Sequence, residues 1–298
     1  MLARREEHRV GLHYLDAATA LLQRNRNLHA TKGLYEAADM QWWWRTPRAT
    51  DNLGQLFWFD DLDRPEAAVI ATAWTDHIAL DTILLPDASP DWVAHVVERG
   101  LAHAAESGFG SVQCEVDQAD DDLRGALISH GFTVKEVGLV ESWLAADARP
   151  AVSPLHDDYR LSNRVDTTMR PHHMIDRSGP EVAQRLLQTS LYRPDLDLLI
   201  LDSDDNHAAH GLFWYDAATA TGLVEPMRTE NEHQRRGLAR HLLTTGINLL
   251  AAAGAVRIKI CFEPGNTASK NLYLDVGFKP VKQTDVMALA GEGLPAKP

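Results

Sequence analysis

Gln234-Arg235-Arg236-Gly237-Leu238-Ala239 lies between an apolar strand and an apolar helix, and this junction decides the fold. The preceding segment, Thr221 to Met227, is predicted as a strand, and the following one has apolar residues at helical spacing through Leu250. The backbone N–H groups in the first turn of a helix lack partners within the helix, and the helix dipole adds positive potential there. The junction is therefore predicted to bind an anion.

The residue types in this loop favour a pyrophosphate. Gly237 lets the backbone approach a ligand because it has no Cβ. Arg235, Arg236 and Arg240 add positive charge at the same point. Arg-Arg-Gly also occurs at ordinary exposed helix starts, so these six residues alone leave both interpretations open.

The segments after this helix favour the pyrophosphate site over an ordinary helix start. Val256 to Cys261 alternates with period two, which predicts a half-buried strand. Asn266 then precedes Tyr273 by seven residues, and Gly277-Phe278 follows. The order of strand, Q-x-x-G-x-A loop, helix, strand, asparagine-to-tyrosine segment and Gly-Phe resembles the GNAT superfamily of acyl-CoA-dependent N-acyltransferases.

This resemblance covers roughly residues 158 to 290. Ala239 stands where many members have glycine, a substitution that the family accepts. The resemblance implies an α/β (α+β) fold in which a mixed, mostly antiparallel sheet is flanked by helices. It also implies acetyl-CoA as the acyl donor.

The N-terminal half of the chain repeats the C-terminal half at an offset of 146 residues. The repeated positions are two glycines 23 residues apart in each copy and the phenylalanine after the second one, namely Gly108, Gly131 and Phe132 against Gly254, Gly277 and Phe278. We therefore predict tandem GNAT-like domains, a plan that resembles mycothiol synthase and its actinobacterial relatives. The predicted parts are residues 1–144 as a degenerate copy, 145–157 as a linker, 158–290 as the catalytic domain and 291–298 as a flexible tail.

The first copy lacks the residues expected to bind a cofactor. The offset projects Gly237 onto Asp91, Arg235 and Arg236 onto Ser89 and Pro90, Tyr273 onto Leu127, Asn266 onto Asp120, and Glu225 onto Ala79. An aspartate repels a pyrophosphate, and a proline removes a backbone donor. We expect the first domain to keep the fold without the cofactor and to have a structural role.

The resemblance also implies where the cofactor lies. The pantetheine arm would pair with the strand end Met227-Arg228-Thr229, where the N–H of Met227 is a candidate oxyanion donor. The pyrophosphate would lie on the loop and the helix start, which comprise Gln234, Arg235, Arg236, Gly237, Leu238, Ala239 and Arg240. Asn266 would hold the cofactor arm or the loop before the second helix.

Acyl transfer to an amine needs a base for the amine proton and benefits from an acid for the departing thiolate. Tyr273 occupies the family's tyrosine position, and a phenol still holds its proton at a pH where a thiol ionises. Glu225 lies two residues before Met227 in the predicted strand, so both side chains point to one face. Tyr273 is the candidate acid and Glu225 the candidate base, acting directly or through water. A core tyrosine and a structural or substrate-orienting carboxylate stay open as alternatives.

The predicted function is an acetyl-CoA-dependent N-acetyltransferase acting on the primary amine of a small molecule, of the amino-sugar, antibiotic or thiol-precursor type. Two alternatives stay open: a non-catalytic acyl-CoA-binding sensor or scaffold, and a protein amine acetyltransferase. The net charge of −13 argues against a nucleic-acid partner and is compatible with a cationic substrate. The oligomeric state is not indicated by any pattern in the chain.

The cysteines and the hydropathy of the chain indicate the cellular compartment in which we expect the protein. Cys114 and Cys261 both lie in predicted strands, which favours buried free thiols over a disulfide. The start of the chain has no signal-peptide pattern, and no stretch approaches the roughly 18 apolar residues that a membrane helix needs. We expect a cytoplasmic protein without a membrane partner.

Two local clusters have no assigned role. Trp42-Trp43-Trp44 cannot all face a core from one helix or strand, and an aromatic wall of a substrate site is the functional alternative to packing. His172-His173 with Asp176 is compatible with a metal ligand pair. No further ligand lies at a suitable spacing along the chain, so no metal is expected.

Overall fold

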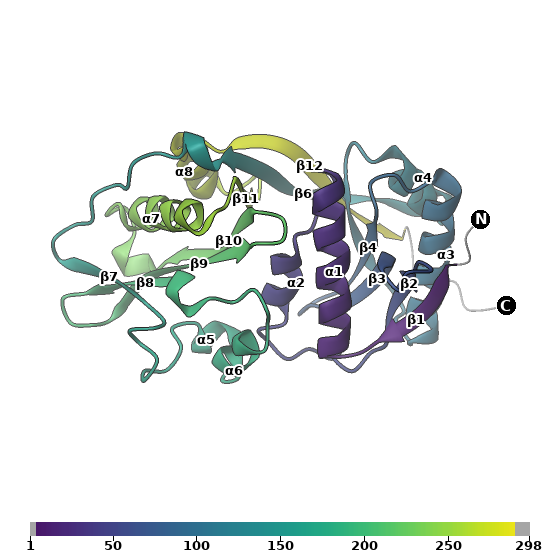
Figure 1. Ribbon diagram of the computed structural model, residues 1–298, viewed down its shortest axis with the longest axis horizontal. Coiled ribbons are helices and arrows are strands. Elements are labelled where there is room, and N and C mark those ends of the chain that lie inside the picture. The colour runs from purple at the N-terminus through teal and green to yellow at the C-terminus, as the bar shows by residue number, and fades with distance from the viewer. Residues whose placement is uncertain (1–3, 290–298) are drawn as a thin grey trace. The chain divides into compact units, whose positions relative to one another are not determined.

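The computed structural model describes residues 4–289, which divide into two compact units (Figure 1). The described part of the first unit is residues 4–40, 47–139 and 282–289, and the second unit is residues 41–46 and 140–281. The predicted tail, 291–298, lies outside the described residues. Among residues 4–289, no helix has both the length and the apolar character needed to cross a bilayer.

The first unit contains a sheet in the order β1-β2-β3-β4-β5-β12-β6. Its elements are β1 (Arg5–Arg9), α1 (Leu12–Leu28), α2 (Ala37–Trp43), β2 (Gln55–Phe59), β3 (Pro65–Ala73), β4 (Ile78–Leu84), α3 (Pro90–Glu106), β5 (Gln113–Asp117), α4 (Asp121–Ser129), the start of β6 (Phe132–Ala145) and most of β12 (Lys279–Leu289). β4 and β5 are parallel, whereas β1 to β4 pair antiparallel in sequence order and β12 pairs antiparallel with β5.

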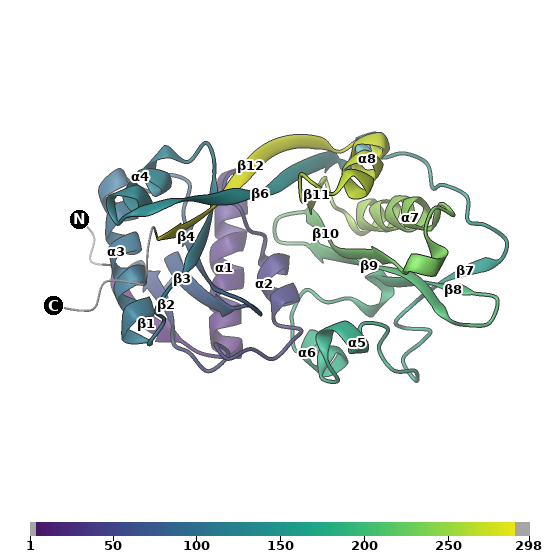
Figure 2. The ribbon, with the colours of Figure 1, turned by 180° about the vertical axis from the view of Figure 1, so that it is seen from behind.

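Both faces of this sheet are covered. Residues 67–72 of β3 are all buried, although neighbouring side chains in a strand point to opposite faces. Helix α1 lies on one face, and α3 and α4 lie on the other (Figures 1 and 2). On the α3 side, Val93, Val96 and Val97 belong to one buried cluster with Val69 and Leu80.

The second unit contains a sheet in the order β6-β11-β10-β9-β8-β7. Its further elements are β7 (Tyr159–Asn163), α5 (Ile175–Ser178), α6 (Val182–Leu187), β8 (Asp197–Asp202), β9 (His207–Asp216), β10 (Thr221–Thr229), α7 (Leu238–Ala253), β11 (Arg257–Phe262) and α8 (Thr267–Val276). Only β10 and β11 are parallel among its pairs. α7 lies along one side of strands β8 to β10, and α5 and α6 lie on the other side (Figures 1 and 2).

The predicted fold class is confirmed, since helices flank a mixed, mostly antiparallel sheet in each unit. The offset of 146 residues reappears at the second helix of each copy, because α4 begins at Asp121 and α8 at Thr267. The four repeated glycines all have a positive φ, between +83° and +112°. Glycine adopts this conformation without the steric cost that a Cβ brings.

The repeat did not predict which strands β11 and β5 would pair with. In the second unit, β11 pairs with residues 140–145 of β6, which end at the first residue of the predicted linker. In the first unit, β5 pairs with residues 284–288 of β12, from the end of the described chain. Each unit is therefore discontinuous along the sequence.

The tryptophan triplet lies at the end of α2. Trp42 and Trp44 are buried, and Trp43 is half-buried. The indole Nε1 of Trp44 donates to Gln188 Oε1 at 2.9 Å, and the Arg185 guanidinium lies 3.9 Å from the centre of its ring. Trp44 thus has a packing and hydrogen-bonding role within the second unit, and an aromatic wall at a substrate site stays a prediction.

Packing of α7 on β9 supplies a test of the fold. A Cβ at Gly246 would overlap the ring of the fully buried Phe213, so Gly246→Ala should lower the free energy of unfolding by about 1–3 kcal/mol. Gly125 lies inside α4 with no atom within 4 Å of an added Cβ, so Gly125→Ala should raise it by up to about 1 kcal/mol. Urea unfolding followed by tryptophan fluorescence measures both, and a neutral Gly246→Ala would contradict the packing.

Candidate active site

The site predicted from the sequence lies where β10 and β11 separate. The two parallel strands pair only from Thr221 with Arg257 to Leu223 with Lys259. β10 continues to Thr229 and β11 to Phe262, so the later residues of β10 have no register partner on β11 within the described chain. Backbone groups beyond Leu223 are therefore available to an extended ligand on that side.

A β-bulge lies directly after this point. The register with β9 shifts between Val224 and Met227, so β10 carries one extra residue there. The indole N–H of Trp214 donates to the carbonyl oxygen of Glu225 at 2.8 Å, and Pro226 has no N–H to offer. Bulges re-aim side chains, and this one turns the chain at the candidate base.

The structure brings Tyr273 into the electrostatic neighbourhood of Glu225. Tyr273 is buried in α8, with its ring centre 6.1 Å from that of Phe262. Burial, together with Cys261 and the charge of Glu225, raises the pKa of the phenol to about 12. The hydroxyl makes no hydrogen bond within residues 4–289 and keeps its proton at neutral pH.

The predicted anion loop joins β10 to α7. Arg235 has φ +60° and Gly237 has φ +78°, so the backbone is left-handed at both residues. Gly237 is the N-cap of α7 and offers no side chain to the first-turn N–H groups. An added Cβ at Gly237 would meet nothing within 4 Å, so space surrounds this end of the helix.

Positive charge surrounds the same helix end. Arg235 and Arg236 are exposed, and α7 has no acidic residue in its first turn. Arg240 forms a partly exposed ion pair with Asp275 at 3.0 Å. Leu238 is buried in the core and Ala239 is half-buried, which fixes the start of the helix. The geometry is that of an anion site at a helix N-terminus.

The remaining predicted residues lie at the edges of this arrangement. Gln234 donates through Nε2 to Asn231 Oδ1 at 3.2 Å, and Arg228 pairs with Glu230. Thr229 ends β10, with its hydroxyl buried and without a hydrogen-bond partner in the described chain. The Oδ1 atom of Asn266 caps α8 by accepting from the N–H of Ser269 at 3.1 Å, and its two predicted roles stay predictions.

Comparison with protein families addresses this same part of the chain. Residues 160–278 match the model described as the acetyltransferase (GNAT) family. These residues belong to the GNAT acetyltransferase family. The matched region is thus an acyltransferase domain by family, and the match ends at Phe278 of the Gly-Phe pair. No curated protein sequence matches the chain.

Solved structures share the fold over the whole length. A tandem GNAT protein from the clavulanic acid biosynthesis pathway has a TM-score of 0.69 at 10% identity, with 99% of this chain and 100% of that chain covered. A GCN5-related N-acetyltransferase from Sphaerobacter thermophilus has a TM-score of 0.63 at 13% identity, with 100% and 98% covered. One from Kribbella flavida has a TM-score of 0.53 at 14% identity, with 86% and 94% covered. At these identities the likeness concerns the fold alone.

The corresponding junction in the first unit is built differently. The loop from β4 to α3 has five residues, 85–89, whereas the loop from β10 to α7 in the GNAT domain has eight, 230–237. Because three residues are missing, the offset of 146 does not hold here, and the N-cap of α3 is Ser89 rather than Asp91. The Ser89 hydroxyl accepts from the N–H of Trp92, and Asp91 lies in the first turn. This helix end is capped and faces a negative charge of its own.

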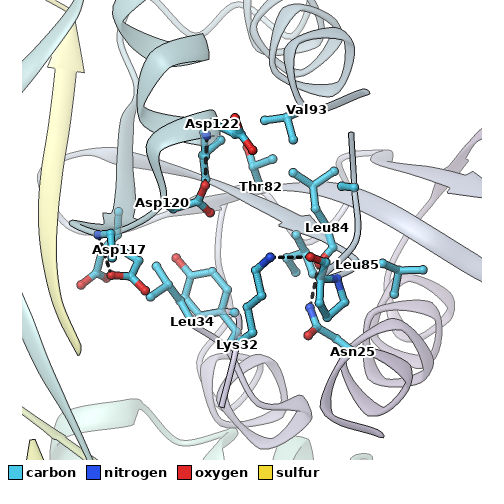
Figure 3. A pocket seen from close by; sticks show the side chains of 18 of the residues that line it. Asn25, Lys32, Leu34, Thr82, Leu84, Leu85, Val93, Asp117, Asp120 and Asp122 are labelled. Carbon is cyan, nitrogen blue, oxygen red and sulfur yellow. Dashed lines mark hydrogen bonds between the residues drawn. The ribbon is translucent and has the colours of Figure 1, made fainter. Parts of the chain in front are cut away.

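A cavity of about 410 Å³ lies beside that junction, between the ends of β4 and β5 (Figure 3). Its wall carries acidic side chains from β5 and the start of α4, namely Glu115, Asp117, Asp120, Asp121 and Asp122. Lys32 also lines the cavity, and its ammonium group donates a hydrogen bond to the carbonyl oxygen of Pro86. The concentration of carboxylates disfavours a phosphate ligand there.

The sequence analysis noted His172 and His173 but not the cluster that they form with Asp197, His207 and His210 in the GNAT domain. His173 lies with its ring centre 5.0 Å from that of His210 and 5.4 Å from that of His207. Asp197, fully buried, lies 3.2 Å from His172 and from His173. These residues come from three separate segments, and only the pairing of β8 with β9 joins the last two, so spacing along the chain gave no signal.

Burial controls the charge of this cluster. It lowers the pKa of His207 to about 4 and that of His210 to about 2, so both rings are neutral at pH 7. Burial also opposes the charged form of Asp197, but the neighbouring His172 and His173 hold its pKa below the usual value. The carboxylate is therefore ionised at neutral pH.

The loop before α7 supplies a direct test of the anion site. Gly237→Asp places a negative charge at the open helix end, so acetyl-CoA affinity should fall at least about 100-fold. Gly108→Asp is the matched control, because Gly108 also has a positive φ and open space around it but lies in the first unit. Calorimetric titration should show one site per chain, lost only in Gly237→Asp. Equal loss in both variants would contradict the assignment.

Proposed function

We propose that the GNAT domain transfers an acetyl group from acetyl-CoA to the primary amine of a small molecule. One observation carries the proposal: an uncapped helix end with surrounding arginines lies at the end of a strand that has separated from its parallel neighbour. These two features suit the two halves of acetyl-CoA, its pyrophosphate and its amide-bearing arm. When bound, acetyl-CoA supplies a thioester carbonyl for attack.

The anchoring part of the site is the loop and the start of α7. The first-turn N–H groups after Gly237 would donate to the pyrophosphate oxygens, and Arg235 and Arg236 would neutralise their charge. The backbone of Met227-Arg228-Thr229 would hold the arm along β10. Tight positioning of the two reactants is a large part of catalysis in such a transfer.

The reacting part of the site is formed by Glu225 and Tyr273. The amine nitrogen attacks the carbonyl carbon, and Glu225 takes the amine proton directly or through water. As the carbon–sulfur bond breaks, Tyr273 donates its proton to the thiolate, since burial keeps the phenol protonated. The N–H of Met227 is our candidate for stabilising the oxyanion.

The first unit is proposed to bind no acetyl-CoA. Its corresponding loop is shorter, Ser89 caps α3, and acidic residues line the adjacent cavity. We assign the substrate to small amines of the amino-sugar, antibiotic or thiol-precursor type, the last being the class suggested by the likeness in domain plan to mycothiol synthase. The acidic balance of the chain suits a cationic amine.

The catalytic roles predict a defined loss of turnover. Tyr273→Phe removes only a hydroxyl from a ring packed beside Phe262, so folding should persist while kcat falls by about 100-fold. Because the pKa of Tyr273 is about 12, the loss should be similar from about pH 6 to about pH 10. Glu225→Gln should lower kcat by about the same factor and remove the acidic limb of its pH profile. Thiol release across an amine panel is the measurement.

Two control variants separate these roles from general damage. Tyr215→Phe changes a tyrosine packed on the same core, and Glu181→Gln changes an exposed glutamate before α6. Both should retain full turnover. Full turnover in Tyr273→Phe and Glu225→Gln would refute the roles assigned here. Tight acetyl-CoA binding without thiol release for any amine would instead favour an acyl-CoA sensor.

A further inference from the structure

We propose that His207, His210 and Glu230 form a binding site for one divalent transition metal ion of the zinc class. One ligand atom from each residue lies within 4.8 Å of the other two. His210 Nδ1 lies 3.1 Å from His207 Nε2. Two ligand atoms that are each about 2.0–2.1 Å from a tetrahedral ion lie about 3.3–3.4 Å apart, so the two rings already have nearly the required spacing.

A second bulge in the sheet creates this pair. Side chains three residues apart in a regular strand point to opposite faces. The register of β9 with β8 runs from Ala209 opposite Ile200 to His207 opposite Leu201, so Ala208 is an extra residue. The extra residue brings His207 to the face that carries His210, and Ala208 itself is fully buried. The bulge therefore places the imidazoles of His207 and His210 on the same face of the sheet.

The carboxylate ligand is held in place by arginines. Glu230 Oε1 accepts from Arg228 Nε at 3.1 Å, and Oε2 accepts from Arg177 Nη2 at 3.2 Å. Each carboxylate oxygen has a further lone pair for a metal. The two guanidinium groups offset the charge of Glu230, which disfavours Ca²⁺ and Mg²⁺, because these ions depend on several anionic oxygens. Two imidazoles with one carboxylate suit Zn²⁺, Co²⁺, Ni²⁺ or Cu²⁺.

The adjacent residues His172, His173 and Asp197 also have ligand atoms within 4.8 Å of one another, but most of their polar atoms already have partners within the protein. His172 accepts from the N–H of Met174 at Nδ1, and its Nε2 lies 3.2 Å from Asp197, so both its nitrogens are engaged. Asp197 also accepts from the hydroxyl of Tyr192 at 2.7 Å. His173 stacks between this group and the proposed ligands, with its Nδ1 buried and unpaired within the described chain. The carboxylate of Asp197 is thus engaged by His172, His173 and Tyr192, which makes His207, His210 and Glu230 the more available set of ligands.

The site leaves one coordination position open. His207 and Glu230 are only partly buried, whereas His210 is buried. Three protein ligands with one exposed side match sites in which water or a substrate group completes the tetrahedron. A metal ion there would supply a Lewis acid, which the acetyl-transfer roles proposed for Glu225 and Tyr273 do not require.

Co²⁺ titration of the full, chelator-treated chain tests the site independently of any activity. We expect one Co²⁺ per chain with the ligand-field absorption of a tetrahedral site, displaced by Zn²⁺ but not by Mg²⁺ or Ca²⁺. His210→Ala should weaken Co²⁺ binding at least about 100-fold, since removal of a direct ligand exceeds the 10–100-fold loss typical of residues behind the ligands. His207→Gln, at a partly exposed position, should do the same with less effect on folding.

An exposed histidine in the same unit provides the control. His156→Ala should leave the affinity and the spectrum unchanged. Circular dichroism of each variant checks that it is folded. Failure of the wild-type chain to take up Co²⁺ would overturn the proposal and leave a hydrogen-bonded histidine network. Uptake that survives in both His210→Ala and His207→Gln would overturn it as well.

Discussion

The candidate active site depends on how briefly β10 and β11 remain paired. Three register pairs join the parallel strands, and then the bulge after Val224 turns β10 away. A longer ladder would satisfy the backbone of β10 internally and leave nothing for a ligand. Trp214 stabilises the turn by donating its indole N–H to Glu225, so the group that fixes the bulge also orients the backbone of the candidate base.

The two units differ in few residues at the helix start that we propose as an anion site in one of them. Both have two parallel strands that are connected through a long helix. In one, α7 starts from a bare glycine after eight loop residues; in the other, α3 starts after five with its own serine cap and an aspartate in the first turn. The helix dipole is the same in both, and its availability to an outside anion is what differs.

Local signals made much of this predictable from sequence. The anion loop follows from residue type, and the position of Tyr273 follows from the resemblance to the GNAT superfamily. The repeated glycines follow from their equal spacing of 23 residues in each copy. The pairing of β11 with β6 and of β5 with β12 was not predictable. The paired segments lie far apart in the sequence, and no local pattern encodes such a pairing. Of the histidine cluster, only His172 and His173 were noted from the sequence. Asp197 and His210 meet through the register of β8 with β9, and the bulge at Ala208 reverses the direction expected for His207.

Two bulges on neighbouring strands therefore organise the functional face of the GNAT domain. The one in β10 opens the sheet at Glu225, and the one in β9 gathers His207 and His210. Because His210 is the register partner of Arg228, which follows Met227 directly, any ligand held by the histidines lies next to the strand end assigned to acetyl-CoA. In a regular strand without the bulge, the side chains of His207 and His210 would point to opposite faces of the sheet. Two departures from the ladder, each of one residue, thus decide which side chains share a face and which backbone groups stay available to a substrate.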